Sequence, residues 1–162
     1  MKHNAHREFA GLEQLKQKQK WQLAQFQLWA SENRWAEFHD AHYDWWMFPV
    51  DQRSAYGFAW TVFDDEISQL RQDSQYIRSY LEGVRLLALS WGWDLEAQAY
   101  IAHPHQDQKW HQWPVRLYKC AKSLQLFGFD SEFASMNKLA IDLMAAGEKM
   151  TFGGHDLSRI FK

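Results

Sequence analysis

Histidine residues form two groups in this chain, and imidazole nitrogens are common ligands of transition metals. His39 and His42 are three residues apart, so on a helix they would lie on the same side, one turn apart. His103, His105 and His111 follow in a polar segment. A site built from His39, His42, His103 and His111 would support metal-dependent hydrolysis, because a bound metal ion activates water. The spacing selects no particular ion, and separate solvent-facing histidines are the competing interpretation.

Cationic and aromatic residues alternate in a second region. The segment 109–113 reads KWHQW and leads into Arg116, Lys119 and Lys122, which recur every three residues. This spacing drifts only slowly around a helix, so it predicts one positive flank beside Trp110 and Trp113. Cations next to indole rings can hold an anion by charge and by stacking. The competing interpretation is a solvated helix face whose alkyl stems cover the core.

The stretch HYDWWMFPV, from His42 to Val50, is the most aromatic part of the chain. On a helix the adjacent residues Trp45 and Trp46 point about 100° apart, so one face cannot hold both. We expect Trp46 and Phe48 to anchor the core, and Trp45, nearer to the His42 side, to form a pocket wall. The predicted ligand-binding residues are therefore Trp110, His111, Trp113, Arg116, Lys119, His42 and Trp45.

Other reactive residue types have no catalytic context. Cys120 has apolar neighbours, which favours a buried, inert thiol. The stretch Ser90-Trp91-Gly92 comes at the end of a predicted helix, whereas a nucleophile elbow needs a strand before its serine. Asp64 and Asp65 place negative charge at the start of a helix, and no Gly-rich phosphate loop occurs. The sequence predicts no catalytic residues and no cofactor.

Composition restricts the class of protein. The net charge of −2 and the pI near 6.4 argue against nucleic-acid binding, which needs concentrated Lys and Arg. A single cysteine excludes an intramolecular disulfide and is typical of a reducing cytoplasm. No apolar run approaches the length of a membrane span. The aromatic fraction of 17%, with ten tryptophans, predicts a core stabilised by large rings.

Helical periodicity dominates the chain between its three prolines. It predicts an all-α, compact, single-domain bundle of about five to seven helices with an aromatic-rich core. The expected helices cover 7–30, 33–47, 64–73, 74–91, 94–102, 114–127 and 130–144. We expect a connecting loop over 50–63, an ordered polar loop over 103–112, and a loosely held tail after Gly147.

Three ordered blocks resemble the conserved region of the opioid growth factor receptor family. They are HYDWWMFPV, then FDDEISQLRQDSQYIRSYLEGVRLLALSWGWDLE, then VRLYKCAKSLQLFGF, and the similarity spans residues 39–143. The matching positions are Trp46, Phe48, Pro49, Arg116, Lys119, Lys122, Ser123 and Leu124, with a lysine at position 119 where the family often has arginine. The resemblance implies a helical fold. It is to short prokaryotic members, whereas the vertebrate receptor is associated with an opioid peptide and the nucleus.

Together these features predict residues 1–38 as an N-terminal helical extension, 39–147 as the conserved helical domain and 148–162 as a tail. The leading functional hypothesis is a non-catalytic binding or regulatory module in the cytoplasm. Its partner would be an anionic small molecule, peptide or protein segment. The alternatives are the metal-dependent hydrolase and a protein that assembles with itself or a partner through the N-terminal helix, whose polar run Gln17 to Lys20 interrupts the apolar stripe.

Overall fold

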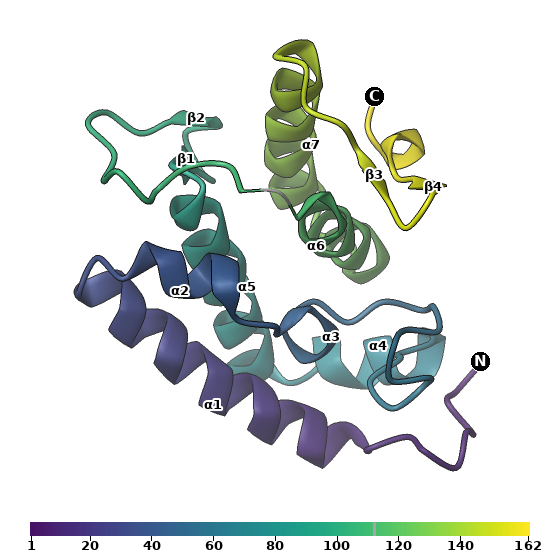
Figure 1. Ribbon diagram of the computed structural model, residues 1–162. Coiled ribbons are helices and arrows are strands. Elements are labelled where there is room, and N and C mark those ends of the chain that lie inside the picture. The colour runs from purple at the N-terminus through teal and green to yellow at the C-terminus, as the bar shows by residue number, and fades with distance from the viewer. Residues whose placement is uncertain (112) are drawn as a thin grey trace.

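Helices form most of the protein in the computed structural model, which describes residues 1–111 and 113–162. The described residues contain seven α-helices, two short β-hairpins and one 3₁₀ turn (Figure 1). This confirms the predicted all-α class. The elements are α1 Leu12–Ser31, α2 Trp35–Asp40, α3 Asp44–Met47, α4 Asp64–Arg71, α5 Ser74–Ser90, β1 Trp93–Asp94, β2 Ala99–Tyr100, α6 Pro114–Phe127, α7 Asp130–Ala145, β3 Thr151–Phe152, β4 His155–Asp156 and η1 Ser158–Ile160.

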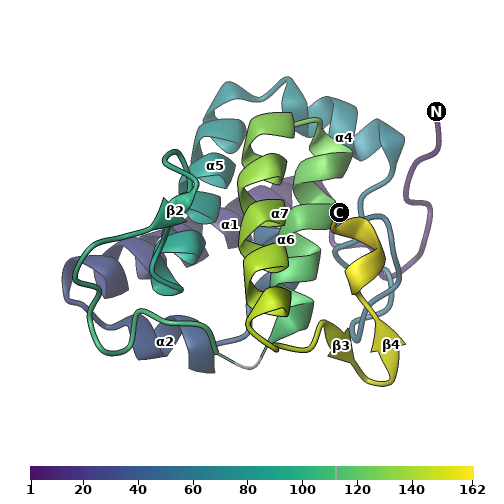
Figure 2. The same cartoon turned by 90° about the horizontal axis from the view of Figure 1, so that it is seen from above.

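Two helix pairs make the framework. The long helix α1 packs along α5, and α6 packs along α7. The short helices α2 and α3 lie between these pairs, with α2 against α1 and α5, and α3 against α1 and α6. Seen from above in Figure 2, α6 and α7 run side by side across the molecule while α1 lies beneath them. The segment from α2 to α3, which carries His39, His42 and Trp45, is thus enclosed on several sides.

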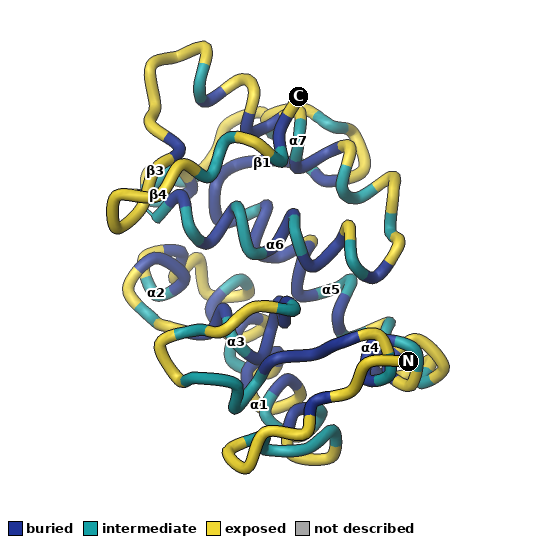
Figure 3. Tube along the Cα trace, turned by 90° about the vertical axis from the view of Figure 1, so that its right-hand side faces the viewer, coloured by how far each residue is buried: buried dark blue, intermediate teal, exposed yellow. Residues whose placement is uncertain are grey.

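Aromatic residues fill the core, as the composition predicts. Phe26 from α1 packs against Phe38 and Tyr43 with ring centroids 4.6 and 4.7 Å apart. Each large ring removes roughly 150–250 Å² from water, so a few of them stabilise a small bundle strongly. Figure 3 shows the buried trace running through every helix. The largest side chains with almost no exposure are Tyr43, Tyr80, Phe26, Phe38, Phe48, Phe127, Leu15, Met47, Leu70, Leu87, Leu117 and Leu124.

The expected helix over 33–47 is wrong, because the chain breaks into α2 and α3. Ala41 has an extended backbone, with ψ near 160°, so α2 stops at Asp40. The carbonyl groups of Phe38 and Ala41 then accept hydrogen bonds from Arg116 instead of from the next helical turn. A side chain from α6 therefore replaces the local helix bonds that the periodicity predicts.

The expected helix over 94–102 is also wrong. Trp93 and Asp94 pair with Tyr100 and Ala99 in an antiparallel hairpin. Gln98 adopts a positive φ of 53° in its turn, a conformation that a helix does not contain. The indole of Trp93 is buried and donates a hydrogen bond to Ser135 on α7. This tertiary contact fixes the segment as a hairpin.

The C-terminal tail is attached to the bundle, contrary to the expectation of a loosely held end. Met150 and Phe161 expose 3% and 7% of their surfaces and belong to the hydrophobic core. Asn137 on α7 exchanges two hydrogen bonds with the backbone of Lys162. Apolar anchors at both ends of the β3–β4 hairpin thus hold the tail against α6 and α7.

At the N-terminal end of the chain, the start of the first helix also differs from the prediction. The first helix begins at Leu12 and not near Arg7, since Gly11 precedes it with a positive φ of 91°.

The predicted loop over 103–112 is present up to His111, whereas Gln112 lies outside the described residues. None of the helices in the described part of the chain combines the length and apolar content that a membrane span requires.

Candidate functional site

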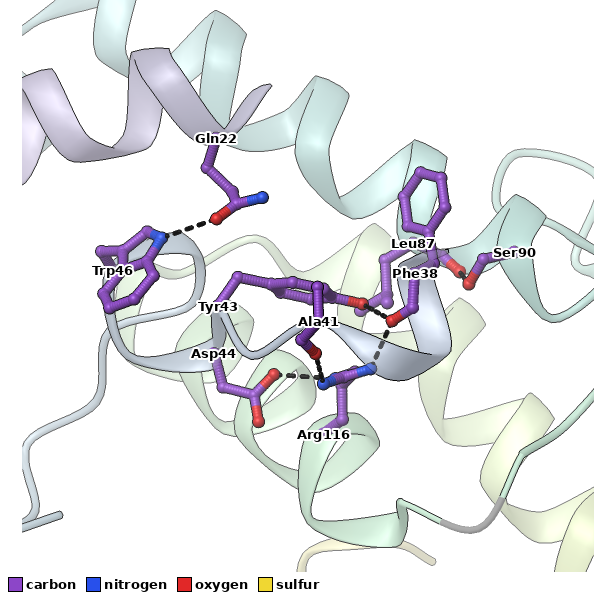
Figure 4. A network of polar contacts seen from close by, with 9 residues as sticks. All are labelled: Gln22, Phe38, Ala41, Tyr43, Asp44, Trp46, Leu87, Ser90 and Arg116. Atoms are coloured by element: carbon purple, nitrogen blue, oxygen red, sulfur yellow. Dashed lines mark hydrogen bonds and ion pairs between the residues drawn. The ribbon is translucent and has the colours of Figure 1, made fainter. Parts of the chain in front are cut away.

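Arg116 lies in the interior of the protein. Its residue surface is only 2% exposed, and its Nε donates to Asp44 Oδ1 at 2.9 Å. Its terminal nitrogens donate to the carbonyl oxygens of Phe38 and Ala41, and the guanidinium carbon lies 4.2 Å from the centre of the Tyr43 ring. Figure 4 shows these partners converging on Arg116 from the α2–α3 segment. The guanidinium is therefore occupied by internal partners.

The predicted positive flank is wrong at its first member. Arg116 faces the core because it must neutralise the buried carboxylate of Asp44, and a buried charge is stable only when paired. Lys119 and Lys122 remain partly accessible on the same helix. The three-residue spacing does not show that Asp44 draws Arg116 inward.

Three other predicted residues meet at the surface. The ring of His42 lies 6.4 Å from that of Trp45 and 6.0 Å from that of Trp113. Tyr56 packs edge-on against Trp45 at 4.8 Å, and Phe152 lies 6.2 Å from Trp113. We call these five residues the aromatic strip. Its members come from the α2–α3 break, α3, residues 51–63 of the connection between α3 and α4 (the 51–63 loop), the residue before α6, and β3.

Lys119 adds a cation to the aromatic strip. Its Nζ lies 4.8 Å from the centre of the Trp45 ring, a cation–π arrangement. Lys119 forms no ion pair with any residue that the structure describes. Burial lowers the pKa of Lys119, and the nearby Arg116 adds to this while Asp44 opposes it. The amino group is thus held near aromatic surface, with no carboxylate of the described residues within ion-pair distance.

A crevice of about 10 Å³ opens beside Trp45 and Lys119. Besides Lys119, it is lined by four apolar residues, Trp45, Phe48, Val50 and Trp60, and by three neutral polar residues, Gln52, Ser54 and Thr61. This volume holds roughly one water molecule, so the crevice cannot enclose an organic ligand. The indole Nε1 of Trp45 is buried and has no acceptor among the described residues. Trp45 is half-buried.

Trp110 and His111 belong to a different contact. Trp110 packs against Trp91 at 5.2 Å, and the ring of His111 stacks on that of His39 at 5.2 Å with an interplanar angle of 11°. The Nε2–H of His39 donates to the carbonyl of Asp107 at 2.9 Å. His39 thus attaches the 103–111 loop to α2, and Trp91 attaches it to the end of α5. The structure therefore divides the seven predicted ligand-binding residues into three groups. Arg116 is buried, Trp110 and His111 hold the loop, and the others lie at the aromatic strip, namely His42, Trp45, Trp113 and Lys119.

The four histidines of the predicted metal site do not converge. His39 and His111 form the stacked pair, whereas His42 lies in the aromatic strip and His103 is exposed in the loop. Among the described residues, no group of three His, Cys, Asp or Glu side chains is arranged to hold a metal ion. Cys120 is fully buried, and burial raises its thiol pKa well above the usual range, as expected for an inert core thiol.

Two members of the aromatic strip are not among the site residues that the sequence predicts. Tyr56 and Phe152 are 52% and 44% exposed, yet they lie in segments expected to be a plain loop and a tail. Each is an aromatic residue directly followed by glycine, which places a large ring at a tight turn. This pairing alone does not identify exposed rings, because Trp91 and Phe127 are also followed by glycine and are buried.

Comparisons with known proteins give no further constraint. No protein-family model matches the chain, and no curated protein and no solved structure matches it. The aromatic strip and Lys119 are consequently interpreted on their own chemistry.

Proposed function

We propose that the protein is a non-catalytic binding module that recognises an acidic peptide segment through the aromatic strip and Lys119. The observation that carries this proposal is the position of the Lys119 amino group over the Trp45 ring, without a carboxylate partner among the described residues. Aromatic side chains and a cation on one surface are the usual anchors of protein interfaces. The strip therefore provides both apolar contact area and a charge for orientation.

An anion is the ligand group that Lys119 favours. Burial lowers its pKa because desolvation disfavours the charged form, and a ligand carboxylate would reverse that effect. Trp45 contributes a second unsatisfied donor, its Nε1–H, next to the same crevice. A ligand oxygen that reached this donor would accept its hydrogen bond. Of these two groups, Lys119 is the one that favours a carboxylate over a neutral ligand, because it carries the charge.

A peptide segment fits the surface better than an enclosed small molecule. The crevice of about 10 Å³ admits only a few atoms, whereas the strip extends from the 51–63 loop to β3. Small-molecule sites instead occupy about 300–1,000 Å³ and bury most of the ligand. An extended segment could lay apolar side chains on Trp113 and Phe152 while one acidic side chain reached Lys119.

Fluorescence anisotropy tests the proposal with a short labelled peptide that alternates glutamate and phenylalanine. We expect Lys119→Met to weaken binding about tenfold, because hydrogen bonds to charged groups contribute about 1.5–3 kcal/mol. Lys122→Met is the matched control, being a partly accessible lysine one turn away on α6. A glutamine analogue of the peptide should bind the wild-type protein as weakly as the acidic peptide binds Lys119→Met.

Two outcomes would reject this binding mode. Equal losses in Lys119→Met and Lys122→Met would show a general charge effect rather than a site. Equal affinity for the glutamate and glutamine peptides would show that the negative charge of the peptide does not contribute to binding. Circular dichroism of both variants verifies that the helices are retained.

We further propose that the chain shares its fold with the opioid growth factor receptor family. The residues that carry the resemblance support a shared fold rather than a shared ligand site, since Trp46, Phe48, Pro49, Ser123 and Leu124 are buried. A cytoplasmic location remains the proposal that the composition favours, with one cysteine and no disulfide.

A further inference from the structure

The outer face of α1 carries large apolar side chains that the rest of the protein covers only in part. Trp21 and Leu28 are 52% and 48% exposed, although large apolar residues are usually buried. They are seven residues apart, two turns of helix, and therefore lie on one face. In Figure 1, α1 forms the lower edge of the molecule, with α2, α3 and α5 on its other side.

This face has the pattern of a helix-pairing seam. Gln14, Trp21 and Leu28 repeat at seven-residue steps, with the small residue Ala24 between the two apolar ones. The inward positions of α1, such as Leu15 and Phe26, lie on the opposite side and are fully buried. The helix thus has one apolar face for its own core and a second, narrower one that is exposed.

We propose that two copies of the chain associate through this face of α1, antiparallel about a two-fold axis. An axis that crosses α1 between Ala24 and Gln25 places Trp21 opposite Leu28 of the second copy. Because the two-fold repeats every contact, both Trp21–Leu28 contacts form at once. A partner of a different sequence would need its own complementary residues, whereas a second copy supplies them automatically.

The hollow beside Trp21 fits the opposing end of α1. It has a volume of about 530 Å³ and is lined by Gln14, Gln17, Lys18, Trp21 and Trp60. With the two-fold axis between Ala24 and Gln25, Leu28 of the second copy approaches this hollow and contacts the two indole rings. The small side chain of Ala24 lets the helix axes approach closely at the crossing.

Charge along α1 favours the antiparallel direction. Lys18 and Lys20 lie in the first half of the helix, and Lys18 forms no ion pair among the described residues. Glu32 follows the last turn, where Arg34 is shared between Glu32 and Glu37, so this group of three carries a net negative charge. The proposed axis brings Lys18 within reach of Glu32 of the second copy. The negative end of the helix dipole adds to this attraction.

Sedimentation of the full chain across a concentration series tests the inference. The full chain is required because α1 supplies core residues such as Leu15 and Phe26. We expect a reversible dimer, near twice the monomer mass of 19.4 kDa at high concentration. Leu28→Glu should abolish it. Ile141→Glu is the matched control, because Ile141 is a similarly exposed aliphatic residue on α7, and it should leave the dimer unchanged.

Charge reversal tests the direction of pairing. Lys18→Glu and Glu32→Lys should each weaken the dimer about three- to tenfold, since an exposed ion pair is individually weak but each pair occurs twice. The double variant Lys18→Glu/Glu32→Lys should recover the wild-type affinity, because it restores both pairs with exchanged charges. A monomer at every concentration, a dimer that survives Leu28→Glu, or no recovery in the double variant would each overturn the inference.

Discussion

Arg116 and Asp44 form an ion pair inside the protein, with Nε 2.9 Å from Oδ1 and side-chain exposures of 3% and 9%. Arg116 belongs to α6, whereas Asp44 opens α3. The same guanidinium also donates hydrogen bonds to the carbonyl oxygens of Phe38 and Ala41 at the end of α2. One side chain therefore fixes the bend between α2 and α3 that presents His42 and Trp45 to the surface. Its role is to position the aromatic strip rather than to contact a ligand.

Removing this arginine should destabilise the whole fold. Arg116→Met leaves the Asp44 carboxylate and the Ala41 carbonyl without a side-chain donor, while the Phe38 carbonyl keeps only the Tyr43 hydroxyl. We therefore expect the free energy of unfolding to fall by about 3–5 kcal/mol. Arg85→Met is the control, since Arg85 pairs with Glu82 on the surface of α5 and should contribute at most about 1 kcal/mol. Urea denaturation measures both free energies of unfolding. Equal losses in the two variants would contradict the structural role of the buried Arg116–Asp44 pair.

Gly92 is a second position where the structure predicts a large effect. Its φ is +74°, and a Cβ atom there would lie 2.9 Å from the backbone oxygen of Gln108. Gly147 has a comparable φ of +97° with no atom within 4 Å of such a Cβ. Gly147→Ala should therefore cost only the backbone strain, about 1–2 kcal/mol. Gly92→Ala should cost clearly more, since it also displaces the loop, and thermal melts of the two variants compare them directly.

Local patterns predicted the long helices well. The steps from Ile77 to Trp91 gave α5, and Pro114 and Gly128 marked the limits of α6, because those signals lie in the helix itself. The break at Ala41 and the hairpin after Trp93 depend on Arg116 and Ser135, which are distant in the sequence. No periodicity within a segment reports a hydrogen bond from another helix.

The candidate surface was predictable only in part. His42, Trp45, Trp113 and Lys119 were named from residue type and spacing, and the structure brings them close together. Arg116 was assigned to the same surface because a cation on α6 looks equivalent to its neighbours until the buried Asp44 is seen. Whether a charged side chain turns inward depends on its partner, and spacing alone does not identify that partner.

Two phenylalanines of the C-terminal segment should respond differently to truncation. Phe161 is 7% exposed and packs in the core, so Phe161→Ala should lower the free energy of unfolding by about 3–5 kcal/mol. Phe152 is 44% exposed, and Phe152→Ala should change it by much less, about 1 kcal/mol. Chemical denaturation distinguishes the two. A small loss for Phe161→Ala would mean that the segment after Gly147 contributes little to the fold.

His39 makes the stability of the protein dependent on pH. Burial lowers the pKa of His39 below its ordinary value near 6.5, with His111 and Arg116 acting in the same direction and the Asp107 carbonyl and Asp40 opposing them. As the pH falls through 6.5, the unfolded chain binds a proton at this position while the folded chain does not. The unfolded state is then favoured, so stability decreases from neutral pH toward the lowered pKa of the folded state.

The variant His39→Gln isolates this contribution, because glutamine keeps an N–H group for the Asp107 carbonyl but does not titrate. We expect the melting temperature of the wild-type protein to fall more steeply between pH 7.5 and pH 5.5 than that of the variant. The difference arises below pH 6.5 and should be absent at pH 7.5 apart from a constant offset. Parallel curves would show that His39 titrates equally in both states, and that its burial against His111 and Asp107 has no effect on its charge.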